Sequence, residues 1–164
     1  MDWQIPLLVS ACAFAAFMVF RFRPVMSDEG RASAVALKDA KQRVVAAKDD
    51  AAKATALCEA ADACARLGRT GAAVAFYLRA LRADPGSKDI AQRAAEGLAR
   101  RPAALEKVMW KQLAATRIAD SEASREAAVI ALRALAASYA TRRRFHARAK
   151  ALENVLEALV ASRS

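Results

Sequence analysis

The sequence has little of what most enzyme sites are built from. It contains one histidine and three cysteines, and aromatic residues make up 6% of the chain. A tetrahedral zinc site needs four clustered ligands and a nucleophilic triad needs a general base, so little material is present for either. A phosphate-cradling glycine loop, a paired cysteine motif and an HExxH motif are also missing from the sequence. We therefore expect no catalytic residue, no cofactor and no metal site.

Strand-favouring residues are scarce as well, whereas alanine is abundant. Alanine accounts for 45 of the 164 residues, and only five glycines and four prolines interrupt the chain. Alanine is the best helix former, while strands favour β-branched and aromatic residues. This composition predicts an all-α fold. Because an alanine side chain buries little apolar area, the hydrophobic fraction of 56% overstates the size of the core.

The first 20 residues hold an uncharged stretch that runs from Trp3 to Phe20. As a helix it would be about 27 Å long, against a hydrocarbon core of roughly 30 Å. We expect residues 1–23 to form a transmembrane anchor, with Trp3 at one interface and Arg21 at the other. The alternatives are a buried core helix, a cleaved signal peptide and lipidation of Cys12. No basic residue precedes the stretch, which disfavours a signal peptide.

Basic residues lie on only one side of that stretch. None precedes it, whereas five follow it closely: Arg21, Arg23, Arg31, Lys38 and Lys41. The positive-inside rule then predicts a cytoplasmic C-terminal domain. Because alanine is abundant and 19 arginines stand against 8 lysines, the composition is typical of a GC-rich bacterial genome, and we expect a single-pass protein of a bacterial inner membrane. Cys58 and Cys64 are six residues apart and would point to different faces of one helix, so we expect no disulfide between them.

The rest of the chain reads as a series of short helices. Pro24 and the polar residues that follow predict a linker over residues 24–30, and expected helix caps are Asp49 or Asp50, Thr70, Ser87 and Ser121. The predicted helices span residues 31–47, 50–67, 71–83, 88–100, 102–116, 122–141 and 144–161. Short loops make consecutive helices antiparallel neighbours, so residues 31–164 are predicted to form a stack of α-hairpins.

One part of this region, residues 54–87, resembles a tetratricopeptide repeat (TPR). It has small residues where two helices would cross, a glycine at the turn, an aromatic residue in the second helix and a closing proline. The residues that carry the resemblance are Leu57, Ala61, Gly68, Ala73, Tyr77, Ala80 and Pro85. Ala60 and Cys64 depart from the pattern, and two weaker units follow downstream. The resemblance implies a short α-solenoid that binds other proteins.

In that family the first helix of each unit lines a groove for a peptide. The resemblance puts Thr55, Cys58, Asp62, Ala65 and Arg66 at groove positions, with Thr55, Cys58, Asp62 and Arg66 as the candidate contacts. Co-chaperone members hold a terminal carboxylate with lysine and asparagine, and here Cys58 and Asp62 stand at those positions. Capture of a chaperone tail is therefore disfavoured, and a purely structural stack without a peptide ligand stays open.

A second candidate surface is a basic run near the C-terminus. Residues 141–150 contain no acidic residue, one phenylalanine and five basic residues, which are Arg142, Arg143, Arg144, Arg148 and Lys150. Such a run can contact an acidic protein, anionic lipid headgroups or nucleic acid, or be a solvated face. We expect a protein partner, keep lipid headgroups as a second candidate and disfavour nucleic acid. His146, Glu153 and Glu157 are expected to be ordinary surface residues.

The function that these patterns predict is a non-catalytic one. We expect a membrane-anchored, TPR-like scaffold or adaptor that mediates protein association or assembly. The alternative is an accessory subunit of a larger membrane complex, which it would contact through its transmembrane helix. Small residues such as Ser10, Ala11 and Ala15 would allow close helix packing there.

Overall fold

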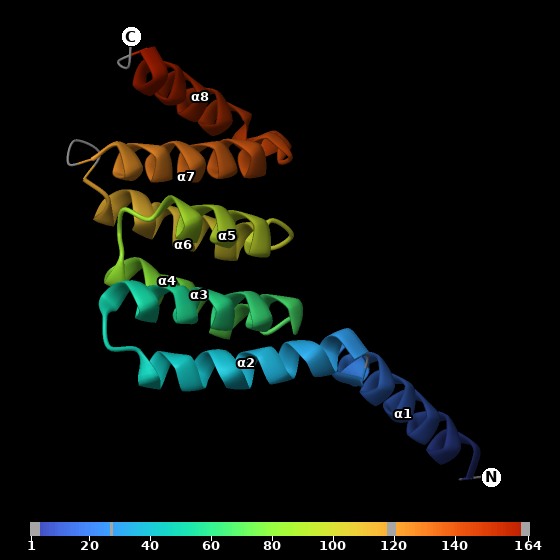
Figure 1. Ribbon diagram of the computed structural model, residues 1–164. Coiled ribbons are helices and arrows are strands. Elements are labelled where there is room, and N and C mark those ends of the chain that lie inside the picture. The colour runs from blue at the N-terminus through green and yellow to red at the C-terminus, as the bar shows by residue number, and fades with distance from the viewer. Residues whose placement is uncertain (1–3, 27, 118–120, 162–164) are drawn as a thin grey trace.

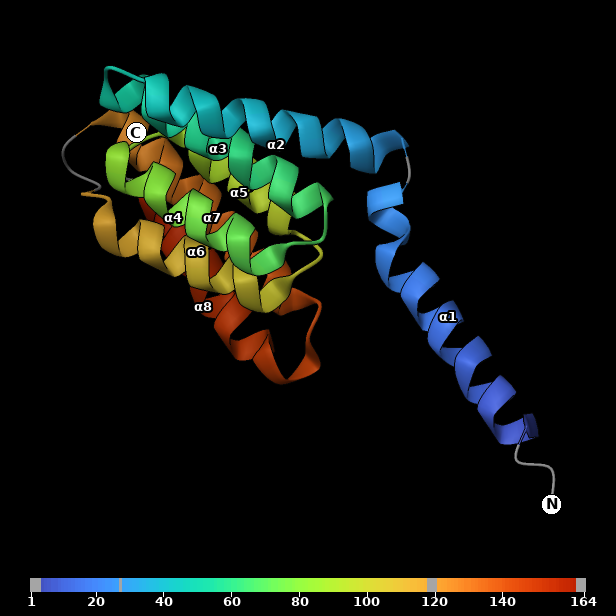
Figure 2. The ribbon, with the colours of Figure 1, turned by 90° about the horizontal axis from the view of Figure 1, so that it is seen from below.

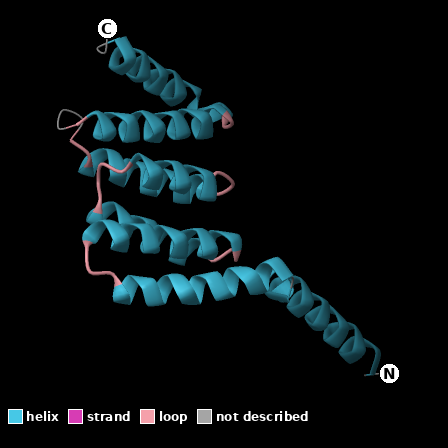
Figure 3. Ribbon diagram, viewed as in Figure 1, coloured by secondary structure: helices cyan, strands magenta, loops and turns pink. Residues whose placement is uncertain are grey.

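The computed structural model describes residues 4–26, 28–117 and 121–161, and all regular secondary structure in these ranges is helical (Figure 3). The expected all-α fold is thus confirmed, whereas the membrane-spanning part of that fold prediction is not, as shown below. The elements are α1 Gln4–Met26, α2 Asp28–Ala46, α3 Asp50–Arg66, α4 Thr70–Ala83, α5 Lys88–Leu98, α6 Pro102–Ala115, α7 Glu122–Ala140, the short 3₁₀ helix η1 Arg143–Phe145 and α8 His146–Ala161.

Local capping signals define where several of these helices begin. The side chain of Asp49 accepts a hydrogen bond from the backbone N–H of Ala52 at 2.5 Å, and Ser121 accepts one from Ser124 at 3.0 Å. Ser87 caps α5 in the same way. Each cap satisfies a backbone N–H that has no partner within the helix. The expected caps at Asp49, Ser87 and Ser121 are confirmed, and so is the position of Pro102 at the start of α6.

The turn between α3 and α4 depends on a glycine. Gly68 has a φ of +71°, in the left-handed region that costs L-residues with a side chain about 1–2 kcal/mol. The next helix begins one residue earlier than expected. Thr70 is its first residue, and the N-cap is Arg69, whose side chain makes no capping hydrogen bond.

The helices form a stack of antiparallel hairpins, α3 with α4, α5 with α6 and α7 with α8 (Figure 1). The first helices of successive hairpins pack on one another, α3 against α5 and α5 against α7, and α2 packs on the outer side of α3. As a result, the turns within hairpins lie at one edge of the stack, and the connections between hairpins lie at the opposite edge (Figures 1 and 2). This is a helical-repeat architecture.

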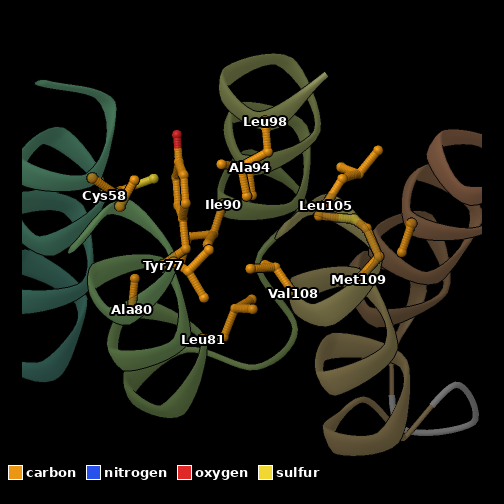
Figure 4. Close-up of a cluster of buried hydrophobic side chains, with 14 of the residues drawn as sticks. Cys58, Tyr77, Ala80, Leu81, Ile90, Ala94, Leu98, Leu105, Val108 and Met109 are labelled. Atoms are coloured by element: carbon orange, nitrogen blue, oxygen red, sulfur yellow. The ribbon is translucent and has the colours of Figure 1, made fainter. Parts of the chain in front are cut away.

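The core of the stack is built from alanines around a few large side chains. Ala61, Ala73 and Ala80 have no exposed surface, which shows how closely their helices approach. Tyr77 is also fully buried, and its ring stands between Cys58 of α3 and Ile90 of α5 (Figure 4). Leu57 is buried, and Pro85 lies in the connection to α5. The residues that suggested the repeat therefore lie at helix contacts and turns, while membership of that family stays a prediction.

The C-terminal hairpin is more open than the others. Helix α8 packs on α7 and on η1, and contacts no other described helix. Only Ala149 and Leu152 of α8 are buried, whereas Val155 and Val160 are about half exposed. The stack therefore ends in a helix that is held on one side only.

Helix α1 contradicts the expected membrane anchor. Over the residues that the structure describes, no helix is long and apolar enough to cross a membrane. The predicted transmembrane anchor over residues 1–23 is therefore wrong, and so is the single-pass inner-membrane localisation that depended on it.

Two further expectations at the N-terminus change with this correction. An accessory subunit that makes its contacts through a transmembrane helix is no longer supported. Residues 24–26 belong to α1 and residues 28–30 to α2, so the predicted linker over 24–30 is largely helical. Trp3 and Ser27 lie outside the described residues, and the structure does not describe the side chains of Arg21 and Arg23.

Candidate functional site

A polar network joins three helices at one side of the stack. The Tyr77 hydroxyl of α4 donates a hydrogen bond to Asp62 Oδ1 of α3 at 2.5 Å, and it lies 3.1 Å from the backbone carbonyl of Arg93 in α5. Arg93 donates to Asp62 Oδ2 from Nε at 2.9 Å and from Nη2 at 2.5 Å. The Asp62 carboxylate is therefore paired at both oxygens, which is how a partly buried charge is stabilised in a protein.

Burial dominates the electrostatics around this network. It raises the pKa of the Tyr77 hydroxyl, and the hydrogen bond to Asp62 raises it further. Burial likewise raises the pKa of the neighbouring Cys58 thiol from 9.0 to about 12, although the Arg93 guanidinium acts in the opposite direction. Since the thiolate is the reactive form of cysteine, Cys58 is a poor nucleophile at neutral pH.

A hollow of about 400 Å³ lies over the network, between α3 and α5. Its walls are formed by Asp62, Ala65, Arg66, Arg93, Glu96 and Gly97. The lack of a side chain at Gly97 is required here, because a Cβ atom at this position would overlap the Tyr77 hydroxyl oxygen. The absence of a side chain at Gly97 thus leaves room for the Tyr77 hydroxyl to bond to Asp62. Gly97 contributes only backbone atoms to the wall of the hollow.

A second hollow of about 430 Å³ adjoins the first along α5. It is lined by residues of α5, α7 and α8, with Val129, Ile130, Leu159 and Val160 as its apolar part. Gln92 lines this hollow and donates a hydrogen bond at 3.0 Å to Glu96, which lines the first. The exposed side of α5 therefore separates two depressions that together follow the first helices of all three hairpins.

The predicted groove residues differ in where they lie relative to the first hollow: on its wall, beneath it or outside it. Asp62 and Arg66 line the first hollow, and Arg66 forms no ion pair with another described residue. Cys58 is 1% exposed and lies beneath the hollow, so its thiol cannot contact a ligand there. Thr55 is exposed but outside the hollow, and its hydroxyl donates to the backbone carbonyl of Ala51 at 3.0 Å.

Sequence reasoning missed two residues of this site, Arg93 and Gly97. Arg93 pairs with a carboxylate 31 positions away, a separation at which no helical periodicity links two side chains. A signal for Gly97 was available, because a glycine inside a helix costs about 1 kcal/mol relative to alanine and needs a packing reason.

The basic run also contains an ordered cluster. The guanidinium carbons of Arg142, Arg144 and Arg148 lie 5.2, 4.8 and 5.2 Å from the centre of the Phe145 ring. Arg142 also lies 5.7 Å from the Tyr139 ring centre, and its Nη2 donates to Ser138 Oγ at 3.1 Å. Cation–π contacts of this kind are worth about 0.5–1 kcal/mol each at exposed sites.

Tyr139 connects this cluster to α6. Its hydroxyl donates to Glu106 at 2.7 Å and accepts a hydrogen bond from the Trp110 indole N–H at 3.2 Å. Arg143 and Lys150, the other members of the predicted basic face, are exposed and outside the contacts with Phe145. The sequence predicted the run of charges and the phenylalanine within it, but not that three arginines would gather around that ring.

The other residues that the sequence analysis considered lie on α8. Within the described ranges, no three His, Cys, Asp or Glu side chains are grouped so that they could hold a metal ion. His146 is exposed at the start of α8, and Glu153 and Glu157 are exposed on the same helix.

Comparison of the chain with known proteins found no match. No protein-family model matches the chain, and no curated protein and no solved structure matches it either.

Proposed function

We propose that this chain is a TPR-like docking module that binds an extended segment of a partner protein along its first helices. The observation that carries the proposal is the hollow over Asp62 and Arg93, which adjoins a second hollow across α5. An extended chain that followed both hollows would contact α3, α5 and α7. Binding in this way needs neither a cofactor nor a catalytic group, and it does not depend on a membrane tether.

The charges in the hollows indicate what such a segment would carry. Asp62 neutralises Arg93, so Arg93 is already occupied and cannot clamp a carboxylate as well. Arg66 is exposed at the same hollow and has no acidic partner among the described residues. A bound segment would therefore place an acidic side chain at Arg66 and an apolar side chain over Val129 and Ile130.

A peptide library panned against the immobilised full-length chain tests this proposal. Enriched peptides are then measured for affinity against the wild type, R66E and R79E. Arg79 is an exposed residue of α4 that lines neither hollow, so R79E changes the net charge by the same amount elsewhere. We expect R66E to weaken binding about tenfold, the equivalent of roughly 1.4 kcal/mol, and R79E to leave it nearly unchanged.

Two results would contradict the proposal. If no peptide is enriched, or if R66E and R79E weaken the enriched peptides equally, the hollow over Asp62 is not the docking site. Circular dichroism of both variants checks that the helical fold is retained.

A further inference from the structure

Arginines mark every turn at one edge of the stack. Arg69 lies in the α3–α4 turn, Arg100 and Arg101 in the α5–α6 turn, and Arg142, Arg143 and Arg144 in the α7–α8 turn. The alternation of antiparallel helices brings these three turns to the same side (Figure 1). We call these six residues the arginine edge. Five of them are exposed and Arg142 is half-buried.

The opposite edge has a different charge pattern. Its connections carry Asp49 between α2 and α3 and Asp84 between α4 and α5, alongside single basic residues such as Lys48, and Asp50 begins α3. The net positive charge of the chain is therefore not spread evenly over the hairpin ends. Since helices pack about 10 Å apart, three successive hairpins extend the arginine edge over about 20 Å.

The charges of the arginine edge are not neutralised within the described part of the chain. None of the six side chains takes part in the ion pairs there, which join Arg43 to Glu59, Lys88 to Glu126 and Arg93 to Asp62. The guanidinium carbons of Arg142 and Arg144 lie 5.2 and 4.8 Å from the centre of the Phe145 ring. Arg144 is exposed, and a guanidinium over an aromatic ring can still donate N–H groups to two oxygens of one phosphate or carboxylate.

An apolar element adjoins this edge. Helix α1 joins α2 on the same side of the stack as the arginine turns and extends away from it (Figures 1 and 2). Its large apolar side chains are exposed by 38–67%, among them Leu8, Phe14 and Phe17. The acidic residues nearest this junction in sequence are Asp28 and Glu29, in the first turn of α2.

We propose that the arginine edge docks on an anionic lipid surface, with headgroup phosphates received by the turn arginines. An extended basic edge next to exposed leucine and phenylalanine side chains matches the two components of a lipid interface, anionic headgroups outside and acyl chains beneath. Nucleic acid would account for the charge but not for the neighbouring apolar helix. The docking is peripheral and requires no helix to cross the bilayer. The residues of the arginine edge line neither of the two hollows of the proposed peptide groove.

Binding of the full chain to vesicles of phosphatidylglycerol mixed with phosphatidylcholine, and to phosphatidylcholine alone, tests this proposal. Each arginine near an anionic surface strengthens binding about fivefold, so R69Q/R100Q should weaken binding to the anionic vesicles about 30-fold. Neither residue stacks on Phe145 or makes a side-chain cap, so both changes are expected to leave the fold intact. The matched control K48Q/R117Q removes two exposed charges at the opposite edge.

The expected result has three parts. The chain prefers anionic over neutral vesicles, added salt weakens that preference by screening, and K48Q/R117Q retains most of it. Equal losses in the two double variants would overturn the proposal, because net charge alone would then explain the binding. Equal affinity for both vesicle types would overturn it as well. So would tighter binding, through the same arginines, to a single-stranded oligonucleotide than to anionic vesicles.

Discussion

At the residue scale, the buried polar groups of this stack differ in how completely they are paired. Asp62, Tyr77 and Arg93 satisfy one another across three helices. Gln112 of α6 has no exposed surface, yet neither its amide nitrogen nor its amide oxygen has a hydrogen-bond partner among the described residues. A buried amide in this state costs free energy without a compensating bond.

Replacement of Gln112 by methionine is therefore expected to stabilise the protein. The two side chains are similar in length, so the change removes the unpaired amide while nearly conserving volume. We expect the free energy of unfolding to rise by about 1–3 kcal/mol, measured by urea denaturation monitored at 222 nm. A matched Q92M variant, at an exposed position of α5, should change it little. A loss of stability in Q112M would show that the amide has a partner in solution.

The buried thiol of Cys58 predicts how stability depends on pH. Its pKa is 9.0 ordinarily and about 12 in the folded chain, because burial disfavours the thiolate. Below pH 9 the thiol is protonated in both states and the protein has its full stability. As the pH rises from 9 towards 12, the unfolded chain loses this proton first, so unfolding becomes easier by about 1.4 kcal/mol per pH unit.

A comparison of the wild type with C58A isolates this contribution. The free energy of unfolding of C58A should fall less steeply above pH 9, whereas both proteins should show the same pH dependence between pH 7 and 8. Tyr77, whose pKa is raised mainly by burial and by its hydrogen bond to Asp62, keeps both of these causes in C58A. Parallel curves above pH 9 would mean that the thiol ionises equally well in the folded state.

At the element scale, the sequence predicted the helices and their starts well, because the responsible signals act within a few residues. Asp49 and Ser121 cap the helices that follow them, and Gly68 has the positive φ expected of a helix C-terminus. The contacts between helices could not be predicted in this way. The hydrogen bonds between Arg93 and Asp62 depend on the packing of α3 against α5. The arginine edge depends on alternate turns lying at one side of the stack.

The N-terminal helix shows the limit of a local pattern. An uncharged run of 18 residues is only just long enough to span a bilayer, so the prediction of an anchor had no margin in length. The groove residues show a related limit. The position of Cys58 in the repeat pattern predicted which face of its helix it occupies. It did not predict that Tyr77 and α5 would cover the thiol and leave it 1% exposed.

The contact between Gly97 of α5 and Tyr77 predicts that the effect of G97A on stability depends on the residue at position 77. Alanine normally stabilises a helix by up to about 1 kcal/mol relative to glycine, but G97A should destabilise this protein because its Cβ would overlap the Tyr77 hydroxyl. The hydroxyl cannot move away cheaply, since it is buried and bonded to Asp62. In a Y77F background the nearest ring atom is 3.4 Å from that Cβ, an ordinary contact, so G97A should become neutral or stabilising there.

Chemical denaturation of G97A, Y77F and the double variant measures this change of sign. The control is G71A, because a Cβ at Gly71 of α4 would meet no atom within 4 Å. If G97A is stabilising in the wild-type background, Tyr77 does not occupy the space beside Gly97 in solution.

At the scale of the whole molecule, stability should be graded along the stack. Each helix of a repeat protein buries its faces only against its neighbours, so the ends depend on fewer contacts than the centre. Helix α3 packs against α2, α4 and α5, whereas α8 packs only on α7 and η1 among the described elements. Local opening is easiest where few apolar contacts hold an element.

Hydrogen exchange of the full chain should therefore show the amides of α8 exchanging much faster than those of α3 and α4.

The variant L152A removes the larger of the two buried side chains of α8, a change that costs about 2–5 kcal/mol in a packed core. If α8 opens by itself, its amides should exchange about 30-fold faster or more in L152A while those of α3 keep their rates, because 1.4 kcal/mol corresponds to a factor of ten. In L57A, where the deleted side chain belongs to the α3–α4 hairpin, α3 and α4 should both lose protection. Equal acceleration of α3 and α8 in L152A would instead mean that the hairpins unfold as one cooperative unit, and that the packing of α8 on α7 alone is enough to couple the last hairpin to the first.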